Sequence, residues 1–404
     1  MPDAQRIEQW YRHAVRACDP REATRLAVRA LAFTTPPCLI AVGKAAASMA
    51  EGAIEALDAV PSEGIVVSPT GHPSTCHGLA HLAGDHPVPG AGSRTAADAI
   101  HALVASPRRA TDALVLVSGG TTSLIAAPVA PVTTAEMLET FELLLASGAP
   151  IEVMNYVRRR MLRWGGGRLA AALAPTRVWC LAVSDVMTGD LASIGSGPCV
   201  ADDGPASVPA ELMQKLPRSV QALLPTPLPR AASPVSARII LDNTTAVSAV
   251  QSQLVDAGLT LATPPLRILA GEAREAGSLL GRHLATMPVG AFVLGGEPTV
   301  TLTRGAGLGG RCQELALAAA HEIRGLPITL LAAGTDGRDG PTDAAGAIVT
   351  GDSWDAMVAA GRDPAADLRT HASHDALAAI HALIPAWPTG TNVNDVVIGV
   401  RRPA

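Results

Sequence analysis

A single lysine in this sequence points to phosphate chemistry. The chain contains 31 Lys and Arg residues, and only Lys44 and Lys215 are lysines. Lys44 follows the apolar run 39–42 and Gly43, at the point where an alanine-rich helix is predicted to begin. A flexible ammonium group at such a strand-to-helix turn suits a phosphate ligand, for which the planar fork of arginine is a poor substitute. We therefore predict that Gly43 and Lys44 contact a phosphate group.

A glycine-rich segment that ends in arginine is the second candidate. Residues 305–310 contain the pattern G-x-G-x-x-G, and Arg311 follows Gly309 and Gly310 at the start of a predicted helix. This pattern is typical of dinucleotide sites when it follows a buried strand. Here the preceding residues 299–303 alternate like a half-exposed, antiparallel strand. A permanent cation at a helix N-terminus instead favours a phosphoryl group during its transfer.

Polar residues also follow two buried apolar runs. Ser118, Gly119 and Gly120 come after the run 113–117, and their backbone N–H and hydroxyl groups favour an anion. Asp185 and Asp190 come after the run 178–183. Carboxylates at a strand end can hold Mg²⁺ or accept the proton of a substrate hydroxyl, and the alternative is that they cap the next helix. The remaining candidate binding residues are Ser196, Gly197, Glu297, Asp336, Asn392 and Asp395, of which the last two are also consistent with simple Asx-turns.

Composition excludes several classes of protein. The formal net charge of −5 and the aromatic content of 2% argue against a nucleic-acid partner. No apolar run is long enough for a membrane span, so we expect no membrane partner. The six cysteines lack C-x-x-C spacing, which disfavours a zinc site or a disulfide framework. We expect a cytoplasmic protein.

The elements that must position these residues are those of an α/β protein. Continuous apolar runs separated by alanine-rich helical segments predict buried, mostly parallel sheets, which bind ligands beyond the carboxyl ends of their strands. A chain of 404 residues exceeds the usual size of one core. The segment 205–234 contains seven prolines and one short helical pattern at 210–216, so we place the domain boundary at its end. The expected domains are 1–235, which carries Lys44, and 236–404, which carries Arg311.

Taken together, these residues resemble the class II glycerate 2-kinase family, some of whose members are labelled hydroxypyruvate reductases. The resemblance runs in order over nearly the whole chain, through Val42–Ala46, His86–Pro89, Ser118–Gly120, Gly165–Ala170, Ser184–Val186, Ser196–Pro198, Gly295–Glu297, Gly309–Arg311, Gly334–Gly337 and Thr391–Asp395. It implies two Rossmann-like α/β domains with the active site in the cleft between them. It also implies transfer of the γ-phosphoryl group of ATP to D-glycerate with Mg²⁺, by a monomer or homodimer. Lys44 and Arg311 match the residues tied to activity in that family.

The resemblance and the residues together give a hypothesis for the reaction. Lys44 and Arg311 neutralise the charge on the phosphoryl group and on the substrate carboxylate, and Asp185 or Asp190 holds the metal or orients the attacking hydroxyl. The chain departs from the family pattern at Thr121-Thr122, at Met187-Thr188 and at Cys312. Two alternatives stay open: an NAD(P)H-dependent hydroxypyruvate reductase, and a non-catalytic protein that binds sugar acids.

Overall fold

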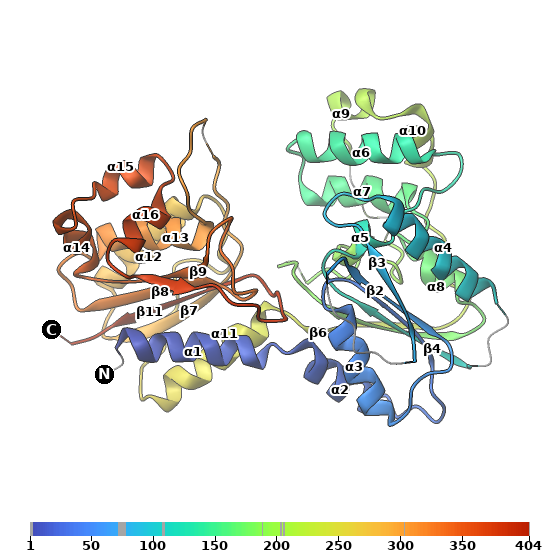
Figure 1. Cartoon of the computed structure of the whole chain (residues 1–404), viewed down its shortest axis with the longest axis horizontal. Coiled ribbons are helices and arrows are strands. Elements are labelled where there is room, and N and C mark those ends of the chain that lie inside the picture. The colour runs from blue at the N-terminus through green and yellow to red at the C-terminus, as the bar shows by residue number, and fades with distance from the viewer. Residues whose placement is uncertain are drawn as a thin grey trace. The chain divides into compact units, whose positions relative to one another are not determined.

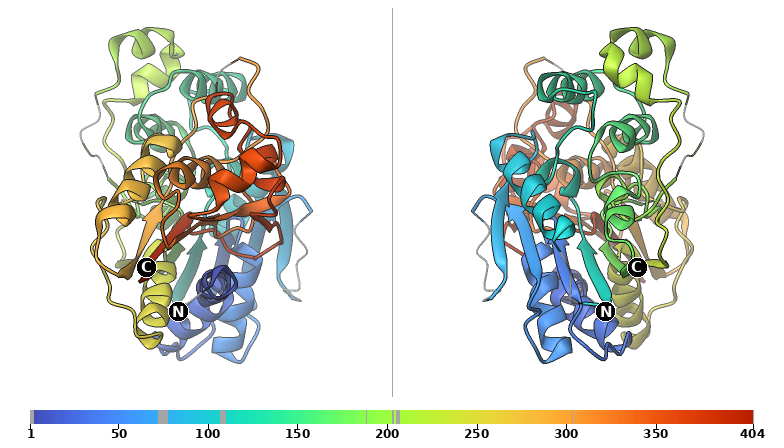
Figure 2. Two further views of the ribbon diagram at one scale, coloured as in Figure 1. Left: turned by 90° about the vertical axis from the view of Figure 1, so that its left-hand side faces the viewer. Right: turned by 90° about the vertical axis from the view of Figure 1, so that its right-hand side faces the viewer.

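The chain forms two compact units in the computed structural model, which describes residues 3–71, 78–106, 110–187, 189–202, 204, 207–302 and 304–403. The insert unit is Pro20–Leu241, and the terminal unit combines Met1–Asp19 with Asp242–Ala404 (Figure 1). Figure 2 gives two further views of the same ribbon.

The insert unit contains a six-stranded sheet in which every neighbouring pair is parallel. The strands in spatial order are β3 (Ala80–Gly84), β2 (Gly64–Pro69), β1 (Cys38–Val42), β4 (Asp112–Val117), β5 (Arg177–Val183) and β6 (Val235–Leu241). This is the order of a doubly wound dinucleotide-binding fold, in which the chain changes direction between β1 and β4. The predicted parallel α/β sheet is confirmed for this unit. Ligands in such folds bind beyond the carboxyl ends of the two central strands.

Helices of the insert unit cover this sheet and form a second core. The helices are α2 (Pro20–Arg29), α3 (Ala46–Leu57), α4 (Ala91–Ala105), α5 (Thr121–Leu124), α6 (Thr134–Ala146), α7 (Ile151–Met161), α8 (Arg168–Ala172), α9 (Ala210–Lys215) and α10 (Arg218–Leu223). Helix α2 begins at Pro20, a position where the missing proline N–H costs nothing. Helices α6, α7, α9 and α10 share their own apolar cluster, in the upper part of this unit in Figure 1.

The terminal unit contains a five-stranded sheet with a different strand pattern. Its strands in spatial order are β10 (Leu383–Pro385), β9 (Ala344–Thr350), β8 (Ile328–Gly334), β11 (Asp395–Arg401) and β7 (Gly290–Gly296). Every neighbouring pair is antiparallel, so the expectation of a mostly parallel second sheet is wrong. Only residues 335–343 separate β8 from β9, and this connection is too short for the crossover that parallel strands need.

Helices cover both faces of this sheet (Figure 1). Helices α1 (Ala4–Ala17) and α11 (Asn243–Asp256) pack together on one face. The other face carries α12 (Ala273–Thr286), α13 (Arg311–Glu322), α14 (Ser353–Ala359), α15 (Pro364–Arg369) and α16 (Ser373–Ala378). Helix α13 is buried along most of its length, which agrees with its alanine-rich sequence.

The two units differ from the expected domains at both ends of the insert. Strand β6 pairs with β5, so residues 236–241 belong to the insert unit rather than to the second domain. Helix α1 packs in the terminal unit, although it begins the chain. The Tyr11 hydroxyl donates a hydrogen bond to the carbonyl of Gly334, at a distance of 2.5 Å. This long-range contact leaves no local signal in the sequence.

The strand expected at 299–303 is also absent from the described residues. Thr299 forms one isolated bridge with Glu272, residues 300–302 form no strand, and Thr303 lies outside the described residues. Leu302 is 67% exposed. The alternation of threonine with apolar residues predicted a strand here, but the described part of the chain has no neighbouring strand to form the backbone hydrogen bonds of a sheet. Among the described helices, none has the length and apolar character needed to cross a membrane.

Candidate active site

Lys44 lies at the turn between β1 and α3, as the sequence predicts. Its backbone N–H donates to the carbonyl of Gly119, and the N–H of Ala45 donates to the Ser118 hydroxyl at 3.0 Å. A Cβ atom at Gly43 would lie 2.0 Å from that hydroxyl oxygen, so only glycine allows β1 and β4 to end this close together. Helix α3 has no side-chain cap at its N-terminus. The exposed Lys44 side chain therefore stands beside helix N–H groups at the centre of the parallel sheet.

Three further groups surround the two glycines that follow β4. A Cβ atom at Gly119 would lie 2.2 Å from Oδ2 of Asp185, and one at Gly120 would lie 3.0 Å from the ring of His86. The stem of Lys44 also lies against Gly120. The segments that follow β1, β3 and β5 thus place Lys44, His86 and Asp185 around the two glycines at the end of β4. His86 was not a predicted site residue, although it belongs to the His86–Pro89 segment that follows β3.

Asp190, Ser196 and Gly197 mainly hold loops in place. Both carboxylate oxygens of Asp190 accept hydrogen bonds within its own loop, from the N–H of Ala192 and the hydroxyl of Ser193. Ser196 is fully buried, and its carbonyl accepts from the N–H of Gly166 at 2.8 Å. The carbonyl of Gly197 accepts from the next N–H in the same way. Asp190 therefore stabilises a turn in its own loop and does not cap the helical turn Ile194–Ser196, whose N-cap is Ser193.

The threonines that depart from the family pattern have structural contacts as well. The Thr121 hydroxyl donates to the carbonyls of Val42 and Ser118, both at 2.8 Å. The Thr122 hydroxyl lies 2.9 Å from that of Ser196. Met187 is half-buried, and Thr188 lies outside the described residues. The departures at Thr121-Thr122 therefore join the ends of β1 and β4 to the neighbouring loop.

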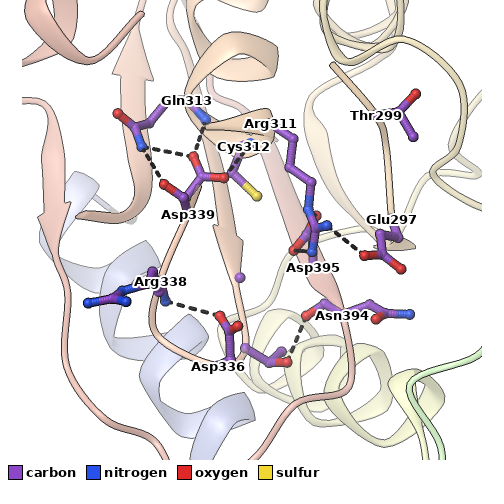
Figure 3. A network of polar contacts seen from close by, with 12 residues as sticks. Glu297, Thr299, Arg311, Cys312, Gln313, Asp336, Arg338, Asp339, Asn394 and Asp395 are labelled. Carbon is purple, nitrogen blue, oxygen red and sulfur yellow. Dashed lines mark hydrogen bonds and ion pairs between the residues drawn. The ribbon is translucent and has the colours of Figure 1, made fainter. Parts of the chain in front are cut away.

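Arg311 is held by two carboxylates at the start of α13 (Figure 3). Its Nε and Nη2 atoms donate to the two oxygens of Asp395, at 2.6 and 3.0 Å, and Nη1 donates to Glu297 at 2.6 Å. The side chain of Asp395 is 1% exposed, whereas those of Arg311 and Glu297 are 32% and 46% exposed. A guanidinium has five N–H groups, so two remain for a ligand after these three bonds.

Burial and charge act in opposite directions on this pair. Burial raises the pKa of Asp395 to about 7, although the guanidinium of Arg311 lowers it. For Arg311, burial lowers the pKa and Asp395 raises it, and the net shift is upward. The guanidinium therefore stays cationic at any physiological pH, and its orientation depends on the ionisation of Asp395.

The N-terminus of α13 binds a carboxylate from the protein itself. The oxygens of Asp339 accept from the N–H groups of Cys312 and Gln313, at 3.0 and 2.8 Å, and from the Gln313 side-chain amide at 2.9 Å. A Cβ atom at Gly310 would lie 2.2 Å from the Asp339 carboxyl carbon, which requires glycine there. Burial raises the pKa of Asp339, and these hydrogen bonds lower it.

This cap changes the interpretation of the glycine-rich segment. The helix N–H groups that we expected to face a phosphoryl group already bind Asp339, so Arg311 itself supplies the donors for a ligand. Asp339 was not among the predicted residues. Cys312 contributes its backbone N–H to the cap, and burial raises the pKa of its thiol well above the ordinary value.

The other predicted binding residues of the terminal unit make turns. The exposed Asp336 accepts from the N–H of Arg338 at 3.0 Å. Asn392 accepts from the N–H of Asn394 at 3.1 Å, which is the Asx-turn that we considered as the alternative. The residues that the structure describes contain no group of three or more His, Cys, Asp or Glu side chains that could hold a metal ion.

A cavity of about 340 Å³ lies beside Arg311 and is lined by residues of the terminal unit alone. Glycines 307, 309 and 310 line it together with Val300, Leu302 and Pro341. Its charged lining residues are Arg311, Glu314, Asp336, Arg338 and His371. Glu314 and His371 were not predicted, because a buried carboxylate inside a helix has no distinctive sequence pattern.

Comparisons with known proteins agree with the fold and with the family resemblance. Residues 6–225 match a family described as a domain of unknown function (DUF4147), and residues 290–395 match the MOFRL family. The chain is 35% identical to the D-glycerate 2-kinase of Thermotoga maritima, over 90% of both chains. It is 37% identical to a putative hydroxypyruvate reductase of Agrobacterium vitis, over 89% of this chain and 85% of that one. The crystal structure of the T. maritima glycerate kinase matches with a TM-score of 0.90 and 33% identity, over 98% of both chains.

Proposed function

Because this chain belongs to the glycerate kinase family, we propose that it transfers the γ-phosphoryl group of ATP to the 2-hydroxyl of D-glycerate. The 2-position follows the name of the T. maritima relative, which is a D-glycerate 2-kinase. In this reaction the 2-hydroxyl releases its proton to solvent and its oxygen forms a bond to the γ-phosphorus. The bond to the β–γ bridging oxygen breaks, and ADP leaves. Such transfers depend on cations that are already positioned around the phosphoryl oxygens.

The fixed orientation of Arg311 is the observation that carries this proposal. Two carboxylates hold its guanidinium, yet about a third of the side chain is exposed and two N–H groups remain for a ligand. An oriented cation of this kind lowers the barrier without reorganisation at the moment of reaction. We assign Arg311 to the phosphoryl group or to the carboxylate of glycerate.

Lys44 supplies the second cation, from the insert unit. It lies where β1 and β4 diverge, which is the position at which doubly wound folds bind their ligands. The flexible ammonium and the uncapped N-terminus of α3 together favour an anion. We assign Lys44 to the phosphoryl group, and we add His86 as a neighbour of the same ligand.

We assign Mg²⁺ to Asp185 because of its position in the fold. Mg²⁺ commonly binds through one or two carboxylates together with water and substrate phosphates, so a three-residue protein cluster is not required. Asp185 is a half-buried carboxylate at the carboxyl end of β5, beside Gly119. When bound, Mg²⁺ neutralises charge on the nucleotide phosphates.

The reductase alternative lacks structural support among the described residues. The segment 305–310 does not follow a strand, and Asp339 occupies the helix N–H groups where a dinucleotide pyrophosphate would bind. The non-catalytic alternative differs from the kinase only in turnover, so it needs a direct assay.

A ³¹P NMR spectrum of the protein with MgATP and D-glycerate tests the proposal. A new phosphomonoester signal should appear together with ADP, and coupling to a single proton would place the phosphate on the 2-oxygen. Intact ATP would contradict the kinase assignment. In that case NADH oxidation with hydroxypyruvate would test the reductase, and calorimetry with D-glycerate would test the non-catalytic binder.

A further inference from the structure

The cavity beside Arg311 has the size and lining of a small-molecule site. Its volume of about 340 Å³ lies within the range of ordinary ligand pockets. Val300, Leu302 and Pro341 provide hydrocarbon walls, and the glycines of 307–310 provide bare backbone. Such walls suit the flat faces of an aromatic base better than a sugar covered with hydroxyl groups.

One buried carboxylate oxygen in this lining has no partner within the described residues. The side chain of Glu314 is 2% exposed, and its Oε2 atom lies 2.9 Å from Nδ1 of His371. Its Oε1 atom is buried without any hydrogen-bond donor. Buried polar atoms normally have partners, so a missing donor on a cavity wall indicates that a ligand supplies it. His371 is itself held at a φ of +58°, a strained backbone conformation of the kind that gathers at functional sites.

The chemistry of the lining discriminates between the two substrates of the proposed reaction. Glycerate is an anion with only three carbons, so it would leave most of the cavity unfilled and would be repelled by Glu314. A 6-aminopurine carries an N–H donor at one edge and two apolar faces. Arg311 and Arg338 line the same cavity, so the phosphate groups of the nucleotide that carries that base would meet two guanidinium groups.

We propose that this cavity binds the adenine base of the nucleotide, with Oε1 of Glu314 accepting a hydrogen bond from the 6-amino group. The identity of the nucleotide rests on the proposed kinase function. The orientation of the base rests on Oε1 of Glu314, which has no hydrogen-bond donor among the described residues. Glu314 is then a specificity residue of the terminal unit, separate from the oriented cation Arg311. The hydrogen bond from His371 to Oε2 keeps the other oxygen directed at the ligand.

Exchange of a single atom in the carboxylate tests this assignment. ITP differs from ATP at purine C6, where a carbonyl replaces the amino group and N1 carries a hydrogen. The wild-type protein should prefer ATP over ITP, by about 5- to 150-fold in kcat/KM, because the buried oxygen would be left facing an acceptor. In Glu314→Gln, the amide oxygen can accept from His371 while its NH₂ group faces the base. The preference should therefore disappear or reverse, which a purely structural role would not produce.

Two further variants complete the design. Glu322→Gln lies on the same helix away from the cavity lining and should keep the wild-type preference. Leu302→Ala removes part of an apolar wall and should raise KM for ATP and ITP by similar factors. If Glu314→Gln fails to fold, equal use of ATP and ITP by the wild type, or an unchanged KM in Leu302→Ala, would overturn the assignment.

The base site can be judged even if the protein is not a glycerate kinase. Calorimetry with ADP and IDP measures the same preference without turnover. Tighter binding of ADP that is lost in Glu314→Gln supports the site, whether or not D-glycerate is phosphorylated. Turnover of ATP with an unchanged ATP-to-ITP ratio in Glu314→Gln overturns the site and leaves the kinase assignment intact.

Discussion

Asp395→Asn should impair catalysis although Asp395 itself need not touch the substrate. The buried carboxylate accepts two of the three hydrogen bonds that orient the Arg311 guanidinium, while Glu297 accepts one from a largely exposed position. Asparagine has nearly the same shape but only one acceptor oxygen, and its NH₂ group would face a donor. The guanidinium should therefore keep its charge and lose its fixed orientation.

The size of the effect follows from burial. Hydrogen bonds to a buried charged group contribute roughly 1.5–3 kcal/mol each, whereas an exposed ion pair contributes about 0.2–1 kcal/mol. Asparagine keeps one acceptor oxygen, so the loss of one Asp395 bond should cost roughly 1.5–3 kcal/mol. This corresponds to a decrease in kcat of about 10- to 150-fold if the loss is fully expressed in the transition state. Glu297→Gln should cost at most about 5-fold.

Steady-state kinetics on Arg311→Ala, Asp395→Asn and Glu297→Gln would give the order of the three effects. We expect Arg311→Ala to lower kcat by at least about 10²-fold, Asp395→Asn to come next, and Glu297→Gln to be mildest. Urea unfolding of each variant separates lost orientation from lost structure. A Glu297→Gln enzyme slower than Asp395→Asn would refute the reasoning, as would wild-type kcat in a folded Asp395→Asn protein.

The remaining predictions concern the insert unit and pH. Lys44→Ala should lower kcat by at least about 10²-fold, and Lys44→Arg should restore little of it, as measured by ADP release. Asp185→Asn should raise the Mg²⁺ concentration that gives the half-maximal rate. Asp190→Ala should leave this concentration unchanged and lower the urea concentration at the midpoint of unfolding. The reverse pattern would make Asp190 the metal ligand and Asp185 the structural residue. Because burial raises the pKa of Asp395 to about 7, a lower pH should protonate this carboxylate and weaken its hydrogen bonds with Arg311. The rate should thus fall as the pH drops through about 7, and Asp395→Asn should lack this limb of the pH profile.

Sequence patterns predicted those features that depend on neighbours along the chain. Lys44 and Ser118–Gly120 follow buried strands. The apolar runs predicted those strands, and the ends of the runs showed which polar residues to consider. The start of α13 at Arg311 was predicted in the same way, from a glycine-rich segment followed by alanines. Asn392 makes the Asx-turn that was the alternative to a binding role, and Asp190 accepts hydrogen bonds within its own loop.

Features that depend on distant parts of the chain could not be predicted in this way. Asp339 caps α13 from a loop 26 residues away from Gln313, so the sequence alone left the helix N-terminus open for phosphate. Glu314 and His371 are separated by 57 residues and show no shared motif. The antiparallel second sheet arises because β11 returns between β7 and β8, a choice of neighbour that apolar runs do not encode.

The pairing of α1 with the terminal unit also fixes an order of events during synthesis. The insert unit is continuous in sequence and is complete once residue 241 has left the ribosome, so it can fold early. Helix α1 can pack against α11 once Asn243–Asp256 has been made, but its packing is complete only after β8, because Tyr11 donates a hydrogen bond to a carbonyl 323 residues further along the chain. Its apolar face, with Ile7 and Trp10, therefore stays uncovered through most of translation. The nascent chain should bind chaperones through this first helix, long before the residues around Arg311 exist.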